Sequence, residues 1–288
     1  MRIYLLNIFF FLYLTVSAQV TDIFPENYTT YFNNTAIVNP GFVPEDSKAE
    51  FFSMYRQRTG AFQKIASYSV TCSKVFRKEN KAAHLARVFF FNEKEGPYID
   101  KPRAYFNYAY AIPISEETSL SAGLSAGFTQ VYFSAPSATA SGNSTMPDGA
   151  FGITFSRKKF FTGISSQQVF NAESNPIKAN VKLRRYYNFL LRQEKDLSPS
   201  LKIRGNFMYQ LLPSNSDLLN FALEGNYNDI LGIGGAYKSR EGLSLLGTVE
   251  TNLGDDKIFI CFAYNTGVLS KLKYGFNSIE INFAYKFN

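Results

Sequence analysis

Residues Ile279-Glu-Ile-Asn-Phe-Ala-Tyr-Lys-Phe287 alternate apolar and polar side chains without interruption and lie next to the C-terminal Asn288. Successive side chains of a β-strand point to opposite faces, so the isoleucines and aromatic residues share one face while the polar residues and an alanine share the other. A soluble edge strand is rarely so apolar and so close to a terminus. The segment is typical of the last strand of an outer-membrane β-barrel.

The other end of the chain predicts export. Met1-Arg2 is positively charged, Ile3 to Val16 are almost wholly apolar, and Val16-Ser17-Ala18 place small residues where a signal peptidase cleaves. The apolar run of about 14 residues is shorter than the roughly 20 that a transmembrane helix needs. We therefore expect residues 1–18 to be a cleaved signal peptide. No later stretch is long and apolar enough for a spanning helix, so membrane insertion would be by strands.

Alternating stretches bounded by Gly, Pro, Asn, Asp and charged clusters predict an all-β protein, a transmembrane antiparallel up-and-down β-barrel of fourteen strands. An aromatic content of 17% with a mean hydropathy of only −0.14 suits strands with one lipid-facing and one polar face. The expected strands are 49–57, 65–73, 84–91, 103–113, 118–129, 148–156, 159–168, 183–191, 199–210, 217–225, 229–237, 242–251, 257–264 and 276–287.

The links between these strands sort by length. Every second link is short, as at Ser115-Glu116-Glu117 and Arg157-Lys158, whereas the longest links, Asn92–Pro102, Gln130–Pro147 and Val169–Lys182, all fall in the other set. Short turns on one side and long loops on the other are a property of bacterial outer-membrane barrels and not of soluble sandwiches. An even strand number then predicts that both mature termini lie on the short-turn, periplasmic side.

Residues 19–48 do not fit the strand pattern, because they contain Pro25, Pro40 and Pro44 together with many Asn and Thr residues. We expect an irregular leader that either hangs in the periplasm or folds into the lumen as a plug. The chain would then comprise a signal peptide at 1–18, this leader at 19–48 and the barrel at 49–288. Closure of the barrel requires the last strand to pair with residues 49–57.

Polar and charged residues inside predicted strands are expected to face the lumen, because a charge on the lipid face near the membrane midplane costs roughly 2–4 kcal/mol. Their mixed signs favour pairing that fills and rigidifies the barrel over a selectivity lining for a solute. The candidate lumen-lining residues are Arg56, Lys202, Arg204, Asn206, Glu224, Glu250, Glu280 and Lys286.

Sequence patterns for catalysis or cofactor binding are weak. A hydrolase would need a base, and the single histidine, His84, lies at a predicted strand end. Gly232-Ile-Gly-Gly235 lacks the following helix of a phosphate-binding loop, so these glycines more plausibly relieve crowding in a strand. Cys72 and Cys261 are expected to be free, buried thiols. We predict no catalytic residue, no cofactor, no metal site and no nucleic-acid partner.

Several short motifs occur in order along the mature chain and together resemble the PorP/SprF family. The resemblance implies an outer-membrane protein associated with the type IX secretion system of Gram-negative bacteria that glide or export large surface adhesins. The motifs are Asn39-Pro40-Gly41, Tyr55-Arg56-Gln57, Ser67-Tyr68-Ser69, Pro147-Asp148-Gly149-Ala150-Phe151-Gly152, Gly163-Ile164-Ser165, Arg185-Tyr186-Tyr187, Pro199-Ser200-Leu201-Lys202 and Asn277-Ser278-Ile279-Glu280-Ile281.

The resemblance implies a non-enzymatic barrel that assists secretion or cell-surface attachment of a type IX substrate such as a gliding adhesin. Its expected partners are that adhesin or another substrate, other secretion or gliding components, and outer-membrane lipids. The long loops would offer an outer binding surface. The alternatives left open are an outer-membrane channel for small or hydrophobic solutes and an outer-membrane hydrolase.

Overall fold

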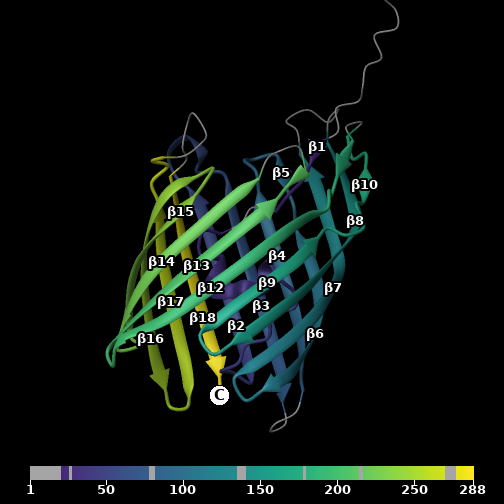
Figure 1. Ribbon diagram of the computed structural model, residues 1–288. Coiled ribbons are helices and arrows are strands. Elements are labelled where there is room, and N and C mark those ends of the chain that lie inside the picture. The colour runs from purple at the N-terminus through teal and green to yellow at the C-terminus, as the bar shows by residue number, and fades with distance from the viewer. Residues whose placement is uncertain are drawn as a thin grey trace, which may run out of the picture.

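In the computed structural model, the described residues are 21–25, 28–77, 82–134, 141–177, 180–213, 217–269 and 277–288. They form a closed antiparallel barrel of fourteen long strands (Figure 1). The predicted signal peptide lies outside the described residues. The barrel strands are β2 (Ala49–Arg58), β3 (Ala66–Arg77), β4 (Ala83–Lys94), β6 (Arg103–Ser115), β7 (Thr118–Phe133), β8 (Gly142–Arg157), β9 (Phe160–Gln167), β12 (Tyr186–Ser198), β13 (Leu201–Leu211), β14 (Leu218–Tyr227), β15 (Leu231–Lys238), β16 (Gly242–Leu253), β17 (Asp256–Asn265) and β18 (Ser278–Phe287).

Each predicted strand corresponds to one barrel strand, and the predicted seam is confirmed. Strand β18 pairs with β2 along its whole length, from Ser278 opposite Arg58 to Phe287 opposite Ala49. On its other side β18 pairs with β17, so the strand nearest the C-terminus has partners along both edges. Closure of this kind leaves the sheet without an open edge.

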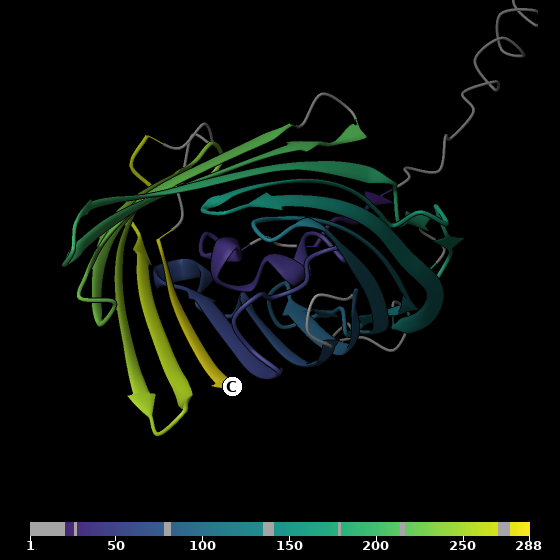
Figure 2. The same ribbon diagram turned by 60° about the horizontal axis from the view of Figure 1, so that its bottom comes forward.

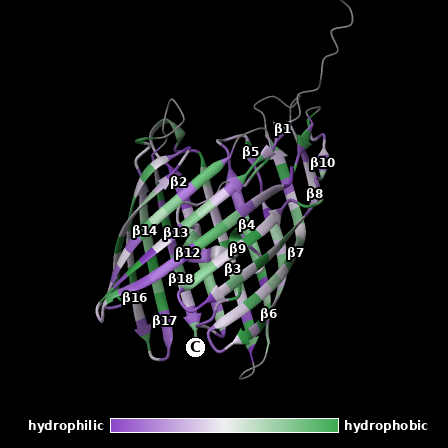
Figure 3. Ribbon diagram, in the orientation of Figure 1, coloured by the Kyte–Doolittle hydropathy of each residue, from purple (hydrophilic) through white to green (hydrophobic). Residues whose placement is uncertain are grey.

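The two faces of the strands differ as the alternation predicts. In β18, Glu280, Asn282 and Ala284 are fully buried, whereas Ile281 and Phe283 are exposed on the outside. Large apolar side chains project outward around the wall, with Ile233 78% and Leu245 67% exposed. Figure 3 shows this alternation of hydrophobic and hydrophilic residues along the strands. An apolar exterior of this extent requires lipid as its solvent.

The two ends of the barrel differ in their connections. Residues 116–117, 158–159, 199–200 and 254–255 form two-residue turns at one end, called here the short-turn end. The opposite, long-loop end carries the short strands β5 (Ile99–Asp100), β10 (Glu173–Ser174) and β11 (Val181–Lys182), and the short 3-10 helix η2 (Gly60–Phe62). No helix among the described residues is long and apolar enough to cross a membrane.

One predicted loop is mostly strand. Residues 130–147 are predicted to be one of the longest links, but β7 extends to Phe133 and β8 begins at Gly142. Val131 and Met146 are fully buried against Ile23 and Val181, which explains why the strands continue. Within that range only 134–141 connects the strands, and 135–140 lie outside the described residues.

The leader runs through the barrel from one end to the other. Its first described residues form β1 (Thr21–Asp22), which pairs with β11 at the long-loop end. The chain then passes through the lumen, including the 3-10 segment η1 (Tyr31–Ile37), and reaches the short-turn end at Ala49 (Figure 2). Ala49 and Asn288 lie together, as an even strand number requires. The described start of the leader, Thr21, lies at the opposite end, so the expectation that both mature termini lie at the short-turn end is wrong for the N-terminal side. The strand count fixes only where the barrel strands begin and end, and the leader crosses the lumen before the first of them.

The two cysteines have different environments. Both are free thiols, as expected. Cys261 is buried on the lumen face of β17, but Cys72 is exposed on the outer face of β3, so the prediction of two buried thiols is wrong for Cys72. The reason is register, since the inward positions of β3 are the odd-numbered Ser67 to Val75.

Candidate functional site: the lumen and its leader

The first attachment of the leader is to the closing strand. The two carboxylate oxygens of Glu280 on β18 accept hydrogen bonds from the backbone N–H of Thr29 at 2.9 Å and of Thr30 at 3.2 Å, and from the Thr30 hydroxyl at 2.9 Å. Asn282, two residues along on the same face, donates to the Thr30 hydroxyl at 2.8 Å. The polar face of the strand that ends the chain therefore binds a segment about 250 residues earlier.

The second attachment lies in the middle of the lumen. Arg192 on β12 donates through Nη2 to the carbonyl of Phe32 at 2.5 Å and to the Thr35 hydroxyl at 2.9 Å. The rings of Tyr31 and Phe32 pack among inward residues of β9 and β12 to β17. Small side chains there leave room for the rings; they are Ala222, Ala236 and Ala263.

The third attachment explains the Asn39-Pro40-Gly41 motif. Asn39 donates from Nδ2 to the carbonyls of Ile153 at 3.2 Å and Ile164 at 3.3 Å, while its Oδ1 accepts from the N–H of Gly41. The motif lies directly against glycines of three adjacent strands, and a Cβ at any of them would overlap the Asn39 side chain or the Pro40 carbonyl. These glycines are Gly123, Gly152 and Gly163.

Neighbouring wall residues complete this docking. The carbonyl of Val38 accepts hydrogen bonds from Ser165 at 2.6 Å and from Gln167 and Asn188 at 2.8 Å. The carbonyl of Gly41 accepts one from Ser121 at 2.7 Å. An irregular buried segment leaves many backbone groups without secondary-structure partners, and here the polar inward face of the wall supplies them. The motif at 39–41 thus meets two wall motifs that are far away in sequence, at 147–152 and 163–165.

A charged cluster lies beside the first attachment. Arg56 is directly opposite Glu280 in the β2–β18 ladder, with Nε 3.5 Å from Oε1, and it also contacts Glu241 through its guanidinium. Lys238 contacts Glu241 from the other side at 2.6 Å. Glu241 lies in the turn between β15 and β16. Burial opposes its ionisation, but Arg56 and Lys238 outweigh that effect and hold the pKa of Glu241 below its usual value.

The predicted lumen-lining residues lie at three depths. Arg56 and Glu280 belong to the cluster near the long-loop end, and Asn206 and Glu224 are buried deeper in the lumen. The remaining four are on inward positions near the short-turn end, partly exposed, each in an ion pair. The pairs are Lys202–Asp229, Arg204–Glu194, Lys257–Glu250 and Lys286–Asp46.

Five buried charged residues in the described part of the wall were not predicted from the sequence, and all occupy inward positions of their strands. They are Arg87, Glu93, Arg103, Asp148 and Lys238. Arg192, which was not predicted either, also occupies an inward position and is partly buried. Each lies an even number of residues from other inward side chains of its strand, so the alternation along the strand could have identified it. Arg192 lies one residue beyond the predicted end of its strand, and Asp148 and Arg103 lie at the first residue of theirs, where a charge is easily taken for part of a loop.

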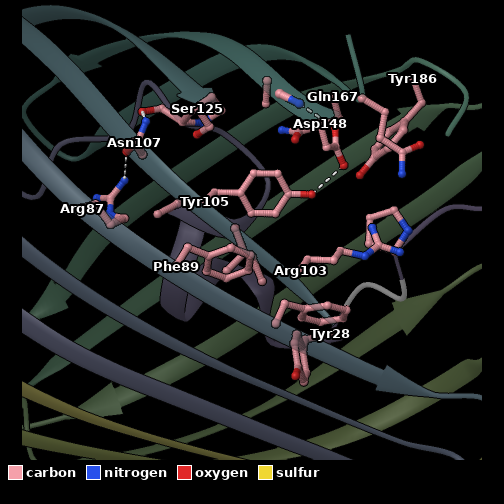
Figure 4. Close-up of a pocket in the computed structure, with 18 residues that line it drawn as sticks. Tyr28, Arg87, Phe89, Arg103, Tyr105, Asn107, Ser125, Asp148, Gln167 and Tyr186 are labelled. Carbon is pink, nitrogen blue, oxygen red and sulfur yellow. Dashed lines mark hydrogen bonds between the residues drawn. The ribbon is translucent and has the colours of Figure 1, made fainter. Parts of the chain in front are cut away.

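A cavity of about 60 Å³ remains between the leader and the wall. Aromatic rings line one side of it, from Tyr28 of the leader, Phe89 and Phe91 of β4 and Tyr105 of β6. Figure 4 shows Tyr105 directed at Asp148, whose carboxylate accepts its hydroxyl at 2.6 Å. Asp148 also accepts from the Thr129 hydroxyl and from the N–H of Gly149.

His84 and Gly232, considered above for catalysis and for phosphate binding, both lie in strands of the wall. His84 is exposed on the outer face of the wall, where its Nδ1 is 2.7 Å from the hydroxyl of Tyr108. Among the described residues, no group of three His, Cys, Asp or Glu side chains is arranged to hold a metal ion. At Gly232, an added Cβ would overlap Thr248 and Asn226, so this glycine relieves crowding between strands.

Comparisons with known proteins complete the description of the site. A family model described as "Type IX secretion system membrane protein PorP/SprF" matches residues 22–285. A search of curated protein sequences gives no match.

Several solved structures share the fold at low identity. The toluene transporter TbuX of Ralstonia pickettii is 12% identical with a TM-score of 0.56, over 88% of this chain and 93% of that one. The toluene transporter TodX of P. putida is 9% identical with a TM-score of 0.57, over 88% and 94%. A FadL homologue of Pseudomonas aeruginosa is 11% identical with a TM-score of 0.54, over 92% and 95%.

Proposed function

The chain belongs to the PorP/SprF family of type IX secretion system membrane proteins, and on that basis we propose that it is a non-enzymatic outer-membrane barrel that assists the secretion or cell-surface attachment of a type IX substrate, such as a gliding adhesin. Its partners are then that substrate, other components of the secretion or gliding machinery, and the lipids around its apolar exterior.

The attachment of the leader is the observation that supports this function best. Residues 28–42 are hydrogen-bonded to β6 to β9, β12 and β18, on opposite sides of the lumen. A lumen occupied by a segment held in this way favours a closed accessory component over an open pore. The long-loop end then offers the surface at which a secreted protein would bind.

The proposal includes an orientation. The long-loop end faces the outside of the cell, and Ala49 and Asn288 face the periplasm, as in barrels with short periplasmic turns. A membrane-impermeant maleimide applied to intact cells tests this. It should label a Tyr98→Cys variant at the long-loop end and leave a Leu253→Cys variant at the short-turn end unlabelled. The opposite labelling pattern would reverse the orientation.

The secretion role is tested by deleting the gene. Immunofluorescence on intact cells and mass spectrometry of the medium would measure the surface-attached and released forms of the cell's type IX substrates. At least one substrate should be lost from the surface and return when the wild-type gene is restored. Unchanged export and attachment of every substrate would exclude the proposed role. A pull-down in mild detergent would then identify the partner.

A channel for small or hydrophobic solutes is the second candidate, and the aromatic-lined cavity beside Phe89 and Tyr105 favours it. Structures of similar fold are described as toluene transporters. Planar-bilayer recording separates the two functions. The accessory function predicts a silent wild-type protein and steady openings only after residues 21–48 are deleted. Large, steady openings from the wild type would favour the channel.

A further inference from the structure

The cavity between the leader and the wall contains polar groups that the fold does not use. It lies toward the long-loop end, between Tyr28 of the leader and the inward faces of β4, β6 and β8 (Figure 4). Buried polar groups are normally hydrogen-bonded, and each exception requires an explanation. Two side chains that line this cavity are such exceptions, Arg103 and Gln168.

One edge of the Arg103 guanidinium makes no hydrogen bond to the described residues. The residue is 2% exposed, and neither Nε nor Nη2 has a hydrogen-bond partner among the described residues. Its Nη2 lies 3.8 Å from Glu93, too far for a hydrogen bond, and Lys101 lies closer to the same carboxylate at 3.4 Å. The Nε and Nη2 hydrogens of a guanidinium point the same way and match the two oxygens of a carboxylate.

Gln168 is the second exception. It is 3% exposed, and neither its amide oxygen nor its amide nitrogen has a partner among the described residues. Its backbone φ of 53° is in the left-handed region, which is unfavourable for a residue other than glycine or asparagine. Gln168 is the residue at which the chain leaves β9. A strained backbone and an unpaired buried amide at one residue favour a role in binding over a role in stability.

The charge of the cavity favours an anion. Arg87 and Arg103 line it, and Asp148 is the one carboxylate among its lining residues, which leaves a net charge of +1. Asp148 already accepts three hydrogen bonds. Arg87 binds neutral acceptors, the side-chain oxygen of Asn107 and the carbonyl of Phe42. The nearest carboxylate to Arg103 outside the lining residues is Glu93, which Arg103 shares with Lys101, so the positive charge within the cavity lining itself has no second carboxylate beside it.

We propose that this cavity is a binding site for a small carboxylate anion, a role separate from the proposed secretion function. The two carboxylate oxygens accept from Nε and Nη2 of Arg103, and the Gln168 amide donates to one of them. The apolar part of the ligand lies against the rings of Phe89 and Phe91. A cavity of about 60 Å³ has room for a few non-hydrogen atoms, since one water needs about 10–15 Å³. Acetate and propionate are of that size.

The test uses the full-length mature protein in lipid nanodiscs, titrated with propionate and followed by saturation-transfer NMR. The wild type should bind propionate saturably. Arg103→Lys keeps the charge but loses the planar two-donor edge, so binding should weaken by about tenfold or more. Arg204→Gln, which removes an arginine at the short-turn end, is the matched control and should bind as the wild type does.

Gln168 provides variants that keep the fold. Gln168→Gly removes the strain of the left-handed backbone conformation together with the side-chain amide. This variant should fold normally and bind propionate more weakly. Gln168→Asn keeps an amide and tolerates the same backbone conformation, so it should retain more of the affinity than Gln168→Gly. The gel shift between unheated and heated samples would confirm that each variant is a folded barrel.

Three results would overturn the proposal. They are the absence of saturable propionate binding to the wild type, unchanged binding in both Arg103→Lys and Gln168→Gly, and inorganic phosphate binding as tightly as propionate. The last result would show that the cavity selects negative charge and not the planar carboxylate.

Discussion

Replacing Gly152 by alanine should release the leader from the wall without opening the barrel. Gly152 lies on the inward face of β8, and an added Cβ would overlap the Asn39 side-chain oxygen and lie 2.9 Å from its Cγ and 3.0 Å from Cδ of Pro40. Ordinary carbon–carbon contact is about 3.5–4.0 Å. The leader would have to move away by roughly 1 Å, because Gly152 is fixed in two strand ladders.

The cost follows from the hydrogen bonds of Asn39. A shift of that size breaks the bonds from its Nδ2 to the carbonyls of Ile153 and Ile164, which are already long at 3.2 and 3.3 Å. Each hydrogen bond lost from a buried polar group costs about 1–3 kcal/mol, so losing both bonds of Asn39 would weaken the docking of the leader by about 2–6 kcal/mol. Taking about 3 kcal/mol, the undocked population rises about a hundredfold.

Hydrogen–deuterium exchange read by mass spectrometry measures that population. In nanodiscs, the amides of residues 29–42 should exchange about a hundredfold faster in Gly152→Ala than in the wild type, while the amides of β12 to β17 keep their protection. Gly247→Ala is the matched control, because a Cβ at Gly247 would have no atom within 4 Å. It should exchange as the wild type does.

Two outcomes would refute this account. If leader exchange in Gly152→Ala matched that of Gly247→Ala, the close contact between Gly152 and Asn39 would not hold the leader. If Gly152→Ala failed to form a heat-modifiable barrel at all, the glycine would be needed for the wall itself.

Three further predictions concern the wall and the charged cluster. Ile281→Arg places a charge on the lipid face and should lower the free energy of unfolding in urea by about 2–4 kcal/mol; a change below 1 kcal/mol would place Ile281 out of contact with lipid. The membrane-permeant N-ethylmaleimide should modify Cys72 but not Cys261 in the folded protein, with mass spectrometry of the unfolded protein as the reference, and modification of both would contradict the burial of Cys261. The pKa of Glu241 is lower in the folded protein than in the unfolded chain. Its contact with Arg56 therefore stabilises the fold fully above the pKa of the unfolded chain, and this stabilisation is lost as the pH falls through the pKa of the folded protein. The stability difference between wild type and Glu241→Gln should therefore persist from pH 7 to about 4.3 and shrink only in more acidic solution, and a difference already lost at pH 5 would refute the shift.

The wall was predictable because its signal is local. Alternation in a segment such as 279–287 reports which side chains face lipid, and the inward positions of Glu280 and Lys286 follow from it. The prediction failed where long-range packing extends a strand. Val131 and Met146 continue β7 and β8 because Ile23 covers them, and no local pattern signals that partner.

The course of the leader could not be predicted for a related reason. Asn39-Pro40-Gly41 carries no periodicity, and its contacts are with glycines more than 80 residues later in the chain. The glycines of β7 to β9 do not by themselves predict that the leader docks there, because glycines in strands also occur where neighbouring strands are crowded. Likewise, Arg103 and Gln168 are marked as candidates by missing partners, a property that exists only in three dimensions.

The bonds from Thr29 and Thr30 to Glu280 set the order in which the molecule can be assembled. The leader is synthesised before all the barrel strands and β18 after the other thirteen, so docking at this point must wait until every intervening strand has been synthesised. Contacts between such distant residues form slowly, because a very long loop must close first. A truncated chain that lacks β18 can neither seal its wall nor complete the docking of its leader at Thr29 and Thr30, so one missing segment exposes both defects to quality control at once.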